Sequence, residues 1–362
     1  MDEQQPDVNK LGGAGDTPSA SSKRSWLKPA LGYLFAAVCL VWVFHDVDVR
    51  DVWRHVRNVN PWWVAVAILC DVLGYVCQGV RWSLLLRPVG RVSTAKSTQA
   101  IYAGLFTNEA LPLKAGELVR AYLIARWLRV KLSAIVPSML VERLLDGIWL
   151  VFGLALAMIF LPLPRNLLEA GDALGIVLVI ATGMFFYVIA RRSKTTIATA
   201  AVNEHRPRES KTWKPLRSMS AMVGRVAGGV QAIGLSRDTY LAFAASFVLL
   251  LLQALSFWLV MYAYGLRRSF FVGAVVFLIV HLGTALPNAP ANIGSYQFFT
   301  VVGLTLFGVD KTYAAGFSVV VFILLTLPLW LLGFVALSRS GTTLLTVREE
   351  ISRLYAGGDE RV

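Results

Sequence analysis

Long apolar stretches recur along the chain, and their lengths match the thickness of a bilayer. About 20 mostly apolar residues cross the hydrocarbon core as a helix, and six stretches meet that test: 26–44, 61–80, 132–162, 173–190, 239–264 and 313–338. Two more apolar stretches, 98–126 and 271–307, are interrupted by polar residues around proline. The pattern predicts an all-α polytopic membrane protein with about six spanning helices.

Both interruptions contain the same tripeptide, Ala-Leu-Pro, at 110–112 and again at 285–287. Paired breaks in corresponding halves of a chain indicate discontinuous helices around a substrate site near the bilayer midplane. We predict that each interrupted stretch is a re-entrant hairpin of broken helix, built around Pro112, Gly116, Pro287, Pro290 and Gly294. The alternative is an ordinary proline kink in a continuous span, which membrane helices tolerate.

The distribution of Lys and Arg sets the expected orientation, because short cytoplasmic loops carry an excess of both. If both hairpins are re-entrant and the N-terminus is inside, most of the 35 basic residues fall on the cytoplasmic side, including those of 81–97. Both termini are then cytoplasmic, in a bacterial inner membrane. The spans that flank the two hairpins run in opposite directions, which is an inverted-topology repeat, and the hairpins should meet in the core and line one cavity.

Three polar segments surround or interrupt this domain. Residues 1–25 hold almost no large apolar side chain and are expected to be a disordered cytoplasmic N-terminus. The transmembrane domain covers 26–338, and 339–362 is a cytoplasmic tail. Within the loop 191–237, apolar residues at helical spacing beside basic ones are typical of an interfacial amphipathic helix on anionic lipids. The alternative is a helix packed on the membrane domain.

Composition excludes most other classes. Hydrophobic residues make up 56% of the chain and the mean hydropathy is +0.60, far above a soluble domain. The net charge of +13 fits basic cytoplasmic loops and anionic lipids better than a nucleic-acid partner. The sequence contains no phosphate-binding loop, dinucleotide fingerprint, nucleophile elbow or zinc spacing, so we expect no cofactor, no metal and no soluble type of catalysis.

The first interrupted stretch carries charged and amide side chains at membrane depth. A single charge near the centre of a spanning helix costs about 2.5 to 3.5 kcal/mol, so such groups pair or line a polar pathway. Spacing of three residues allows a salt-bridged ladder along one helical face, and free N–H groups after the proline attract an anion. The alternative is a self-neutralising network that only holds the hairpin together. The residues concerned are Asn108, Glu109, Lys114, Glu117 and Arg120.

A second charged layer lies in the next span, at Glu142, Arg143 and Asp146. Arg143 has the planar fork that binds a phosphate through two hydrogen bonds, and either acid could exchange a proton. The alternative is that Arg143 only pairs with Glu117 or Asp146.

The second interrupted stretch is almost free of charge and offers Asn288, Asn292 and Gln297. Neutral amides and bare backbone suit hydroxyl groups of a sugar or lipid headgroup, although a polar loop satisfied within itself is the alternative. In the span 61–80, Asp71 and Gln78 are expected to make packing hydrogen bonds.

In the identity and order of these residues, the chain resembles the lysylphosphatidylglycerol synthase transmembrane-region family, a flippase-like membrane domain. The resemblance implies movement of a lipid with a polar headgroup between leaflets, for example aminoacylated phosphatidylglycerol, hopanoids or polyprenyl-linked sugars. Without the soluble aminoacyl-transfer domain of the synthases, no aminoacyl-lipid synthesis is expected from this polypeptide alone. Ala291 and Asn292 replace the family's paired glycines, and Gln297 replaces its usual acid. The matching residues are Arg81-Trp82, Leu84-Leu85, Asn108 to Arg120, Glu142-Arg143, Asp146, Leu286-Pro287, Pro290 and Gly294.

The leading hypothesis is a lipid translocase in which Lys114, Arg120 and Arg143 bind a phosphate. Acids balance those charges, and the partner is a phospholipid or lipid-linked glycan. One alternative is a membrane-embedded glycosyl or phospholipid transferase, with Glu109 or Asp146 as base. Another is a scaffold for a lipid-modifying enzyme, and homo-oligomers are compatible with all three.

Overall fold

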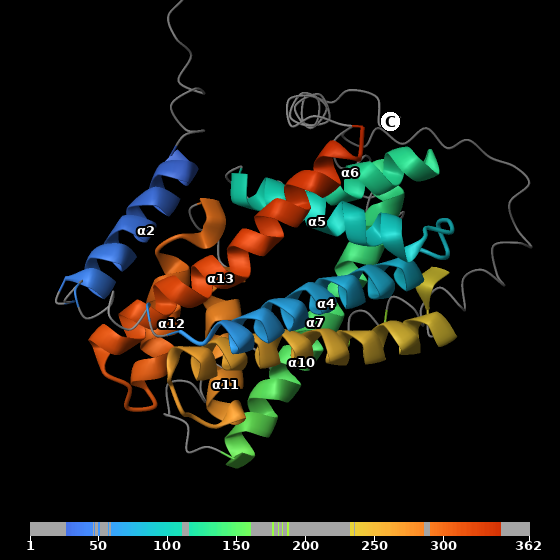
Figure 1. Ribbon diagram of the computed structural model, residues 1–362. Helices are drawn as coiled ribbons and strands as arrows, with labels where there is room; N and C mark the ends of the chain where they lie inside the picture. The colour runs from blue at the N-terminus through green and yellow to red at the C-terminus, as the bar shows by residue number, and fades with distance from the viewer. Residues whose placement is uncertain are drawn as a thin grey trace, which may run out of the picture.

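A computed structural model describes residues 27–45, 59–110, 116–160, 232–234, 236–285 and 290–341, with a few isolated positions between them. Every regular element in these ranges is helical (Figure 1). The helices are α2 Leu27–Phe44, α4 Pro61–Leu85, α5 Thr94–Ala110, α6 Gly116–Leu128, α7 Leu132–Phe160, α10 Arg237–Tyr264, α11 Phe270–Ala285, the 3₁₀ turn η2 Pro290–Asn292, α12 Ser295–Thr305 and α13 Lys311–Ser338.

Several predicted features lie outside the described residues. They are the disordered segment 1–25, Pro112, Lys114, most of the span 173–190, almost all of the loop 191–237 with its interfacial helix, Pro287, Asn288 and the tail from residue 342.

Three of the described helices, α4, α10 and α13, are long and apolar enough to cross a membrane. They confirm the predicted spans 61–80, 239–264 and 313–338, while α2 and α7 are helices at 26–44 and 132–162. The chain is therefore an integral membrane protein, and its described elements are all helical. One boundary was wrong: α4 continues to Leu85, so Arg81 is buried within a helix and does not start a cytoplasmic loop.

The central pair of helices is α4 and α10, which run antiparallel and lie side by side (Figure 1). At one end Asn60 N donates to Ala263 O at 3.1 Å, and further along the pair Ser256 Oγ donates to Ala67 O at 2.8 Å. At the other end Arg87 forms an ion pair with Asp238. Small residues along this seam let the two backbones approach, as is common between membrane helices.

The first interrupted stretch consists of two helices folded against each other, so it is not one kinked span. α5 and α6 pack antiparallel, with Gly104 and Gly116 at the closest approach. A Cβ atom added to Gly104 would lie 2.7 Å from Gly116 O. Glycine at both positions is therefore a steric requirement.

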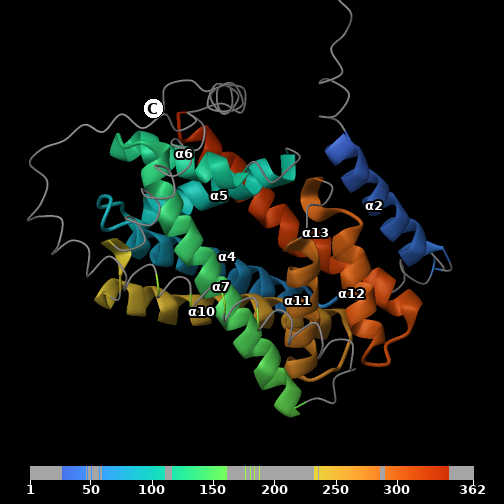
Figure 2. The same cartoon turned by 180° about the vertical axis from the view of Figure 1, so that it is seen from behind.

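The second interrupted stretch is also an antiparallel pair, formed by α11 and α12 (Figure 2). Gly283 of α11 contacts the ring of Phe299, and Gly303 of α12 contacts Val276. Between the helices, Pro290 opens the turn η2, where Ala291 and Asn292 have φ of 59° and 52°. Gly294 follows with φ of 87° and packs against the backbone of Ala36 in α2.

The two hairpins are held by the long helices and by each other. α5 runs along α13, where Gly333 contacts the backbone of Tyr102 and Gln99 Nε2 donates to Ala336 O at 3.0 Å. α5 also contacts η2. The ends of both hairpins therefore reach the same central region of the bundle.

We expect Gly116→Ala to lower the free energy of unfolding by about 1 to 3 kcal/mol, because the added methyl group overpacks the contact with Gly104. Denaturant unfolding of the purified protein in detergent micelles measures this change. Gly183→Ala is the matched control, because an added Cβ meets no atom within 4 Å in the part of the chain that the structure describes. Equal stability of Gly116→Ala and the wild type would show that the hairpin does not depend on this contact.

Candidate functional site

A buried carboxylate in α7 is the centre of the charged layer. Glu142 is completely buried, and its two carboxylate oxygens bind different arginines. Oε1 lies 2.6 Å from Arg81 Nη2, and Oε2 lies 2.9 Å from Arg120 Nη1. Gln78 Nε2 also donates to Oε1, at 3.0 Å. One acid thereby links α4, α6 and α7.

Arg81 extends these contacts to a fourth helix. Its guanidinium forms a second ion pair, with Asp146, and donates to Ser246 Oγ in α10 at 3.2 Å. Arg81 is fully buried, so each of these contacts offsets part of the cost of removing the charge from water. Its neighbour Trp82 is also fully buried, and the guanidinium carbon of Arg120 lies over its indole ring, 5.0 Å from the ring centroid.

The most exposed arginine among these ion pairs is Arg143. This arginine forms an ion pair with Glu117 of α6 and lies 3.6 Å from Asp146 Oδ2. Its side chain is 51% exposed, against 25% for Asp146 and 0% for Glu142. Three arginines and three acids, which we call the arginine network, therefore balance in charge: Arg81, Arg120, Arg143, Glu117, Glu142 and Asp146.

The structure brings together five of the predicted site residues, Glu117, Arg120, Glu142, Arg143 and Asp146. It differs from the predicted ladder within one helix, because Glu117 and Arg120 of α6 both pair with residues of α7. The pairing of Arg143 with Glu117 and Asp146 was the alternative left open by the sequence.

Arg81 was missed as a site residue. The basic residue was counted in a loop, although the apolar run resumes at Leu84 and Leu85 directly after it. That resumption was the signal for a longer helix.

Two of the predicted binding amides serve the helix breaks. Asn108 Oδ1 accepts a hydrogen bond from Gly116 N at 2.7 Å, at the first residue of α6. Gln297 Oε1 accepts one from Gly294 N at 2.8 Å, at the start of α12. Backbone N–H groups at a helix start have no partner within the helix, so both amides stabilise the broken ends.

A cavity of about 170 Å³, which we call the arginine cavity, lies against the network. Arg81, Arg143, Asp146, Gln78 and Ser246 line its polar side. The network is therefore partly accessible from inside the bundle. A polar space between helices is where substrate contacts are expected in a transport pathway.

A neighbouring cavity of about 180 Å³, the aspartate cavity, is lined by Asp71, Glu109 and Asn292 among others. Residues of α5, α11, η2 and α12 all line it, so helices of both interrupted stretches meet at one cavity. The two cavities share four lining residues, Tyr75, Leu105, Gln253 and His281.

The expectation for Asp71 and Gln78 was half right. Gln78 makes a packing hydrogen bond to Glu142. Asp71 lines the aspartate cavity, and none of the hydrogen bonds or ion pairs in the described part of the chain involves its carboxylate.

Comparison with known proteins gives one family and several distant relatives. The family model described as the lysylphosphatidylglycerol synthase TM region matches residues 29–333. A UPF0104 membrane protein of Methanothermobacter thermautotrophicus is 22% identical over 311 residues, covering 81% of this chain and 90% of the relative. The UPF0104 membrane protein MJ1595 of Methanocaldococcus jannaschii is 22% identical over 331 residues, covering 89% and 95%.

A shorter match involves the glycosyltransferase AglD of Haloferax volcanii. It is 28% identical over 116 residues, which are 32% of this chain and 19% of that protein.

We expect Glu142→Gln to lower the free energy of unfolding by about 3 to 5 kcal/mol, because it leaves Arg81 and Arg120 buried without their shared acid. Asp238→Asn is the control, since it breaks the more exposed pair with Arg87 and should cost about 0 to 1 kcal/mol. Denaturant unfolding in micelles measures both. Equal losses in the two variants would contradict a central role for Glu142.

Proposed function

Because the chain belongs to the lysylphosphatidylglycerol synthase transmembrane-region family, we propose that it is a lipid translocase. Its substrate is an anionic lipid, either a phospholipid or a polyprenyl-phosphate-linked glycan, that moves between the leaflets of a bacterial inner membrane. The observation that carries the proposal is the arginine cavity, a polar space with two arginines inside the helical bundle.

The headgroup contact is assigned to Arg143. A lipid phosphate matches the guanidinium fork in geometry and charge. Arg143 is half exposed and faces the arginine cavity, whereas Arg81 and Arg120 are buried and already paired with acids. A phosphate would displace the half-exposed Glu117 from Arg143 and leave the buried pairs intact.

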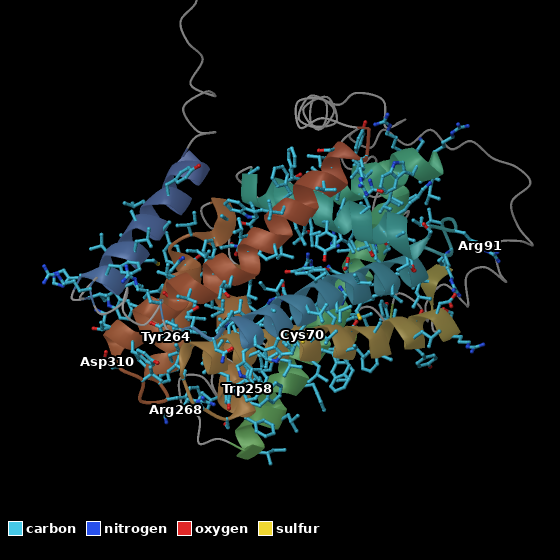
Figure 3. The ribbon with its side chains drawn as sticks, viewed as in Figure 1. Cys70, Arg91, Trp258, Tyr264, Arg268 and Asp310 are labelled. Carbon is cyan, nitrogen blue, oxygen red and sulfur yellow. The ribbon has the colours of Figure 1, made fainter. Side chains whose placement is uncertain are left out.

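The proposed movement of lipid past this site requires that each hairpin enters and leaves the membrane on the same face. The two ends of the first hairpin meet, because Gly90 before α5 contacts Leu128 at the end of α6. The two ends of the second also meet, since Arg268 Nη2 donates to Gly308 O at 3.4 Å. Arg91 lies at one end of the bundle and Arg268 and Asp310 at the other (Figure 3). This arrangement supports hairpins that enter from opposite faces.

Helix contacts also support an inverted repeat. α4 packs on α5 as α10 packs on α11, and α5 packs on α6 as α11 packs on α12. The hairpins exchange partners between halves, since α5 packs on α13 and α11 packs on α7. A two-fold axis in the membrane plane relates contacts in this way, and it would pass between the antiparallel α4 and α10.

A transferase is the second candidate, favoured by the short match to a glycosyltransferase. Glu109 and Asp146, the acids proposed as its base, line the aspartate and arginine cavities respectively. A sugar or headgroup donor would be its co-substrate. The third candidate, a scaffold for a lipid-modifying enzyme, requires neither cavity to bind lipid.

Single cysteines introduced into a variant without Cys39, Cys70 and Cys77 test the topology. We expect Arg91→Cys and Arg129→Cys to react with a membrane-impermeant maleimide from the cytoplasmic face. Arg268→Cys and Lys311→Cys should react from the opposite face. Labelling of the first two positions from different faces would contradict a re-entrant first hairpin.

We expect Arg143→Gln to slow translocation of phosphatidylglycerol by about tenfold or more. A charge-assisted hydrogen bond contributes about 1.5 to 3 kcal/mol, and each 1.4 kcal/mol corresponds to a factor of ten. The assay follows fluorescent phosphatidylglycerol in proteoliposomes, with dithionite to quench the outer leaflet. The translocation rate of Arg143→Lys should lie between those of the wild type and Arg143→Gln, because lysine keeps the charge but lacks the planar fork of the guanidinium.

Arg87→Gln is the matched control, because Arg87 is 54% exposed and its pair with Asp238 lies outside both cavities. It should translocate at the wild-type rate. Formation of a new lipid on addition of a sugar-nucleotide or lipid donor would favour the transferase. Wild-type protein that neither moves lipid nor modifies it would favour the scaffold.

A further inference from the structure

The aspartate cavity contains a buried acid that lacks the neutralising contacts of the arginine network. Asp71 lies near the middle of α4, is 6% exposed and lines the cavity. Glu142, at comparable burial, has two guanidinium partners. For Asp71, the described part of the chain provides neither a hydrogen bond nor an ion pair. Of these two buried carboxylates, that of Glu142 is therefore neutralised by arginines, and that of Asp71, within the described residues, is not.

A charged carboxylate in a low-dielectric interior is costly unless a counter-charge neutralises it. A second acid, Glu109 of α5, lines the same cavity, and the described lining residues include no Lys or Arg. In the described part of the chain, the other titratable groups near Asp71 are Cys70 and Tyr75 of α4, Tyr102 of α5, His281 of α11 and Tyr296 of α12. The carboxylate of Asp71, unpartnered among the described residues, therefore favours a cation in this cavity.

The rest of the lining suits a small, oxygen-seeking cation. Gln253, Thr284 and Asn292 carry amide or hydroxyl oxygens, which together with carboxylates are the ligands of hard cations. The chain leaves the helical conformation at Ala291 and Asn292, both of which line the cavity. Unwound backbone at a helix break is where transporters hold sodium ions and protons.

We propose that the aspartate cavity binds one small monovalent cation, a proton or a sodium ion, between the carboxylates of Asp71 and Glu109. A cation held there joins the helices α4 and α5 of one half to η2 and α12 of the other. Binding of the cation does not require the proposed function. Its role as the coupling ion rests on the proposed function.

The shared walls of the two cavities provide the route for coupling. Tyr75, Leu105, Gln253 and His281 line both cavities. A side chain that turns toward a cation in one cavity changes the shape of the other. An effect of cation on lipid binding must then be matched by an equal effect of lipid on cation binding.

The sodium arm of the test measures binding of radioactive sodium to the full chain in nanodiscs. We expect saturable binding that Asp71→Asn weakens by about tenfold or more, which corresponds to about 1.4 kcal/mol. Asp238→Asn, an acid at the end of α10 outside the cavity, should bind as the wild type does. If Asp71→Asn does not yield monodisperse protein, Glu109→Gln is measured in its place with the same expectation.

The proton arm applies if no sodium binds. The infrared spectrum of the wild type at neutral pH should then show the carbonyl band of a protonated carboxylic acid, which Asp71→Asn or Glu109→Gln removes and Asp238→Asn retains. Absence of both sodium binding and this band overturns the cation site.

Coupling is tested separately in proteoliposomes with a sodium or pH gradient across the membrane. We expect the gradient of the cation that binds to raise the rate of phosphatidylglycerol translocation, and Asp71→Asn to abolish the increase. Cation binding without any lipid translocation would sink the proposed function and keep the site. Translocation that ignores both gradients would overturn the coupling role.

Discussion

A bilayer offers no hydrogen-bond partner to the open ends of a helix, and the two helix breaks are built around that constraint. Asn108 accepts from the first N–H of α6, and Gln297 accepts from Gly294 at the start of α12. The two halves also meet near the breaks, because α5, which ends before the first break, contacts η2, which follows the second. Glycine at the closest approaches lets the helices of each hairpin pack tightly against each other.

The arginine network meets the same constraint for charge. Each buried charge has an opposite charge within hydrogen-bond reach, and the whole network is neutral. A buried network of this kind contributes little net stability, yet removal of one member leaves an uncompensated charge. Contacts of Arg81 with α7 and α10 are satisfied in only one arrangement of the helices. The network therefore selects this arrangement over other apolar packings of similar area.

Features that depend on local sequence could be predicted, whereas features that depend on contacts between helices could not. The helical spans and the positions of the helix breaks could be predicted, because the lengths of apolar runs and the positions of proline are local properties. The partners of Glu117 and Arg120 were not, since spacing within α6 says nothing about which side of α7 faces it. The roles of Asn108 and Gln297 were also hidden, because an amide has the same chemistry whether it binds a headgroup or a helix end. Asp71 was expected to be satisfied by packing, and only its position at the cavity revealed otherwise.

Electrostatics links the two cavities more closely than their shared walls do. The arginine network is neutral before substrate arrives, so a lipid phosphate adds negative charge to a low-dielectric space. The carboxylate of Asp71 in the neighbouring cavity opposes that addition. A cation on Asp71 removes the opposition, and phosphate and cation together leave the charge of the membrane interior unchanged. The two proposed sites should therefore fill together, because each bound ion lowers the cost of bringing in the other.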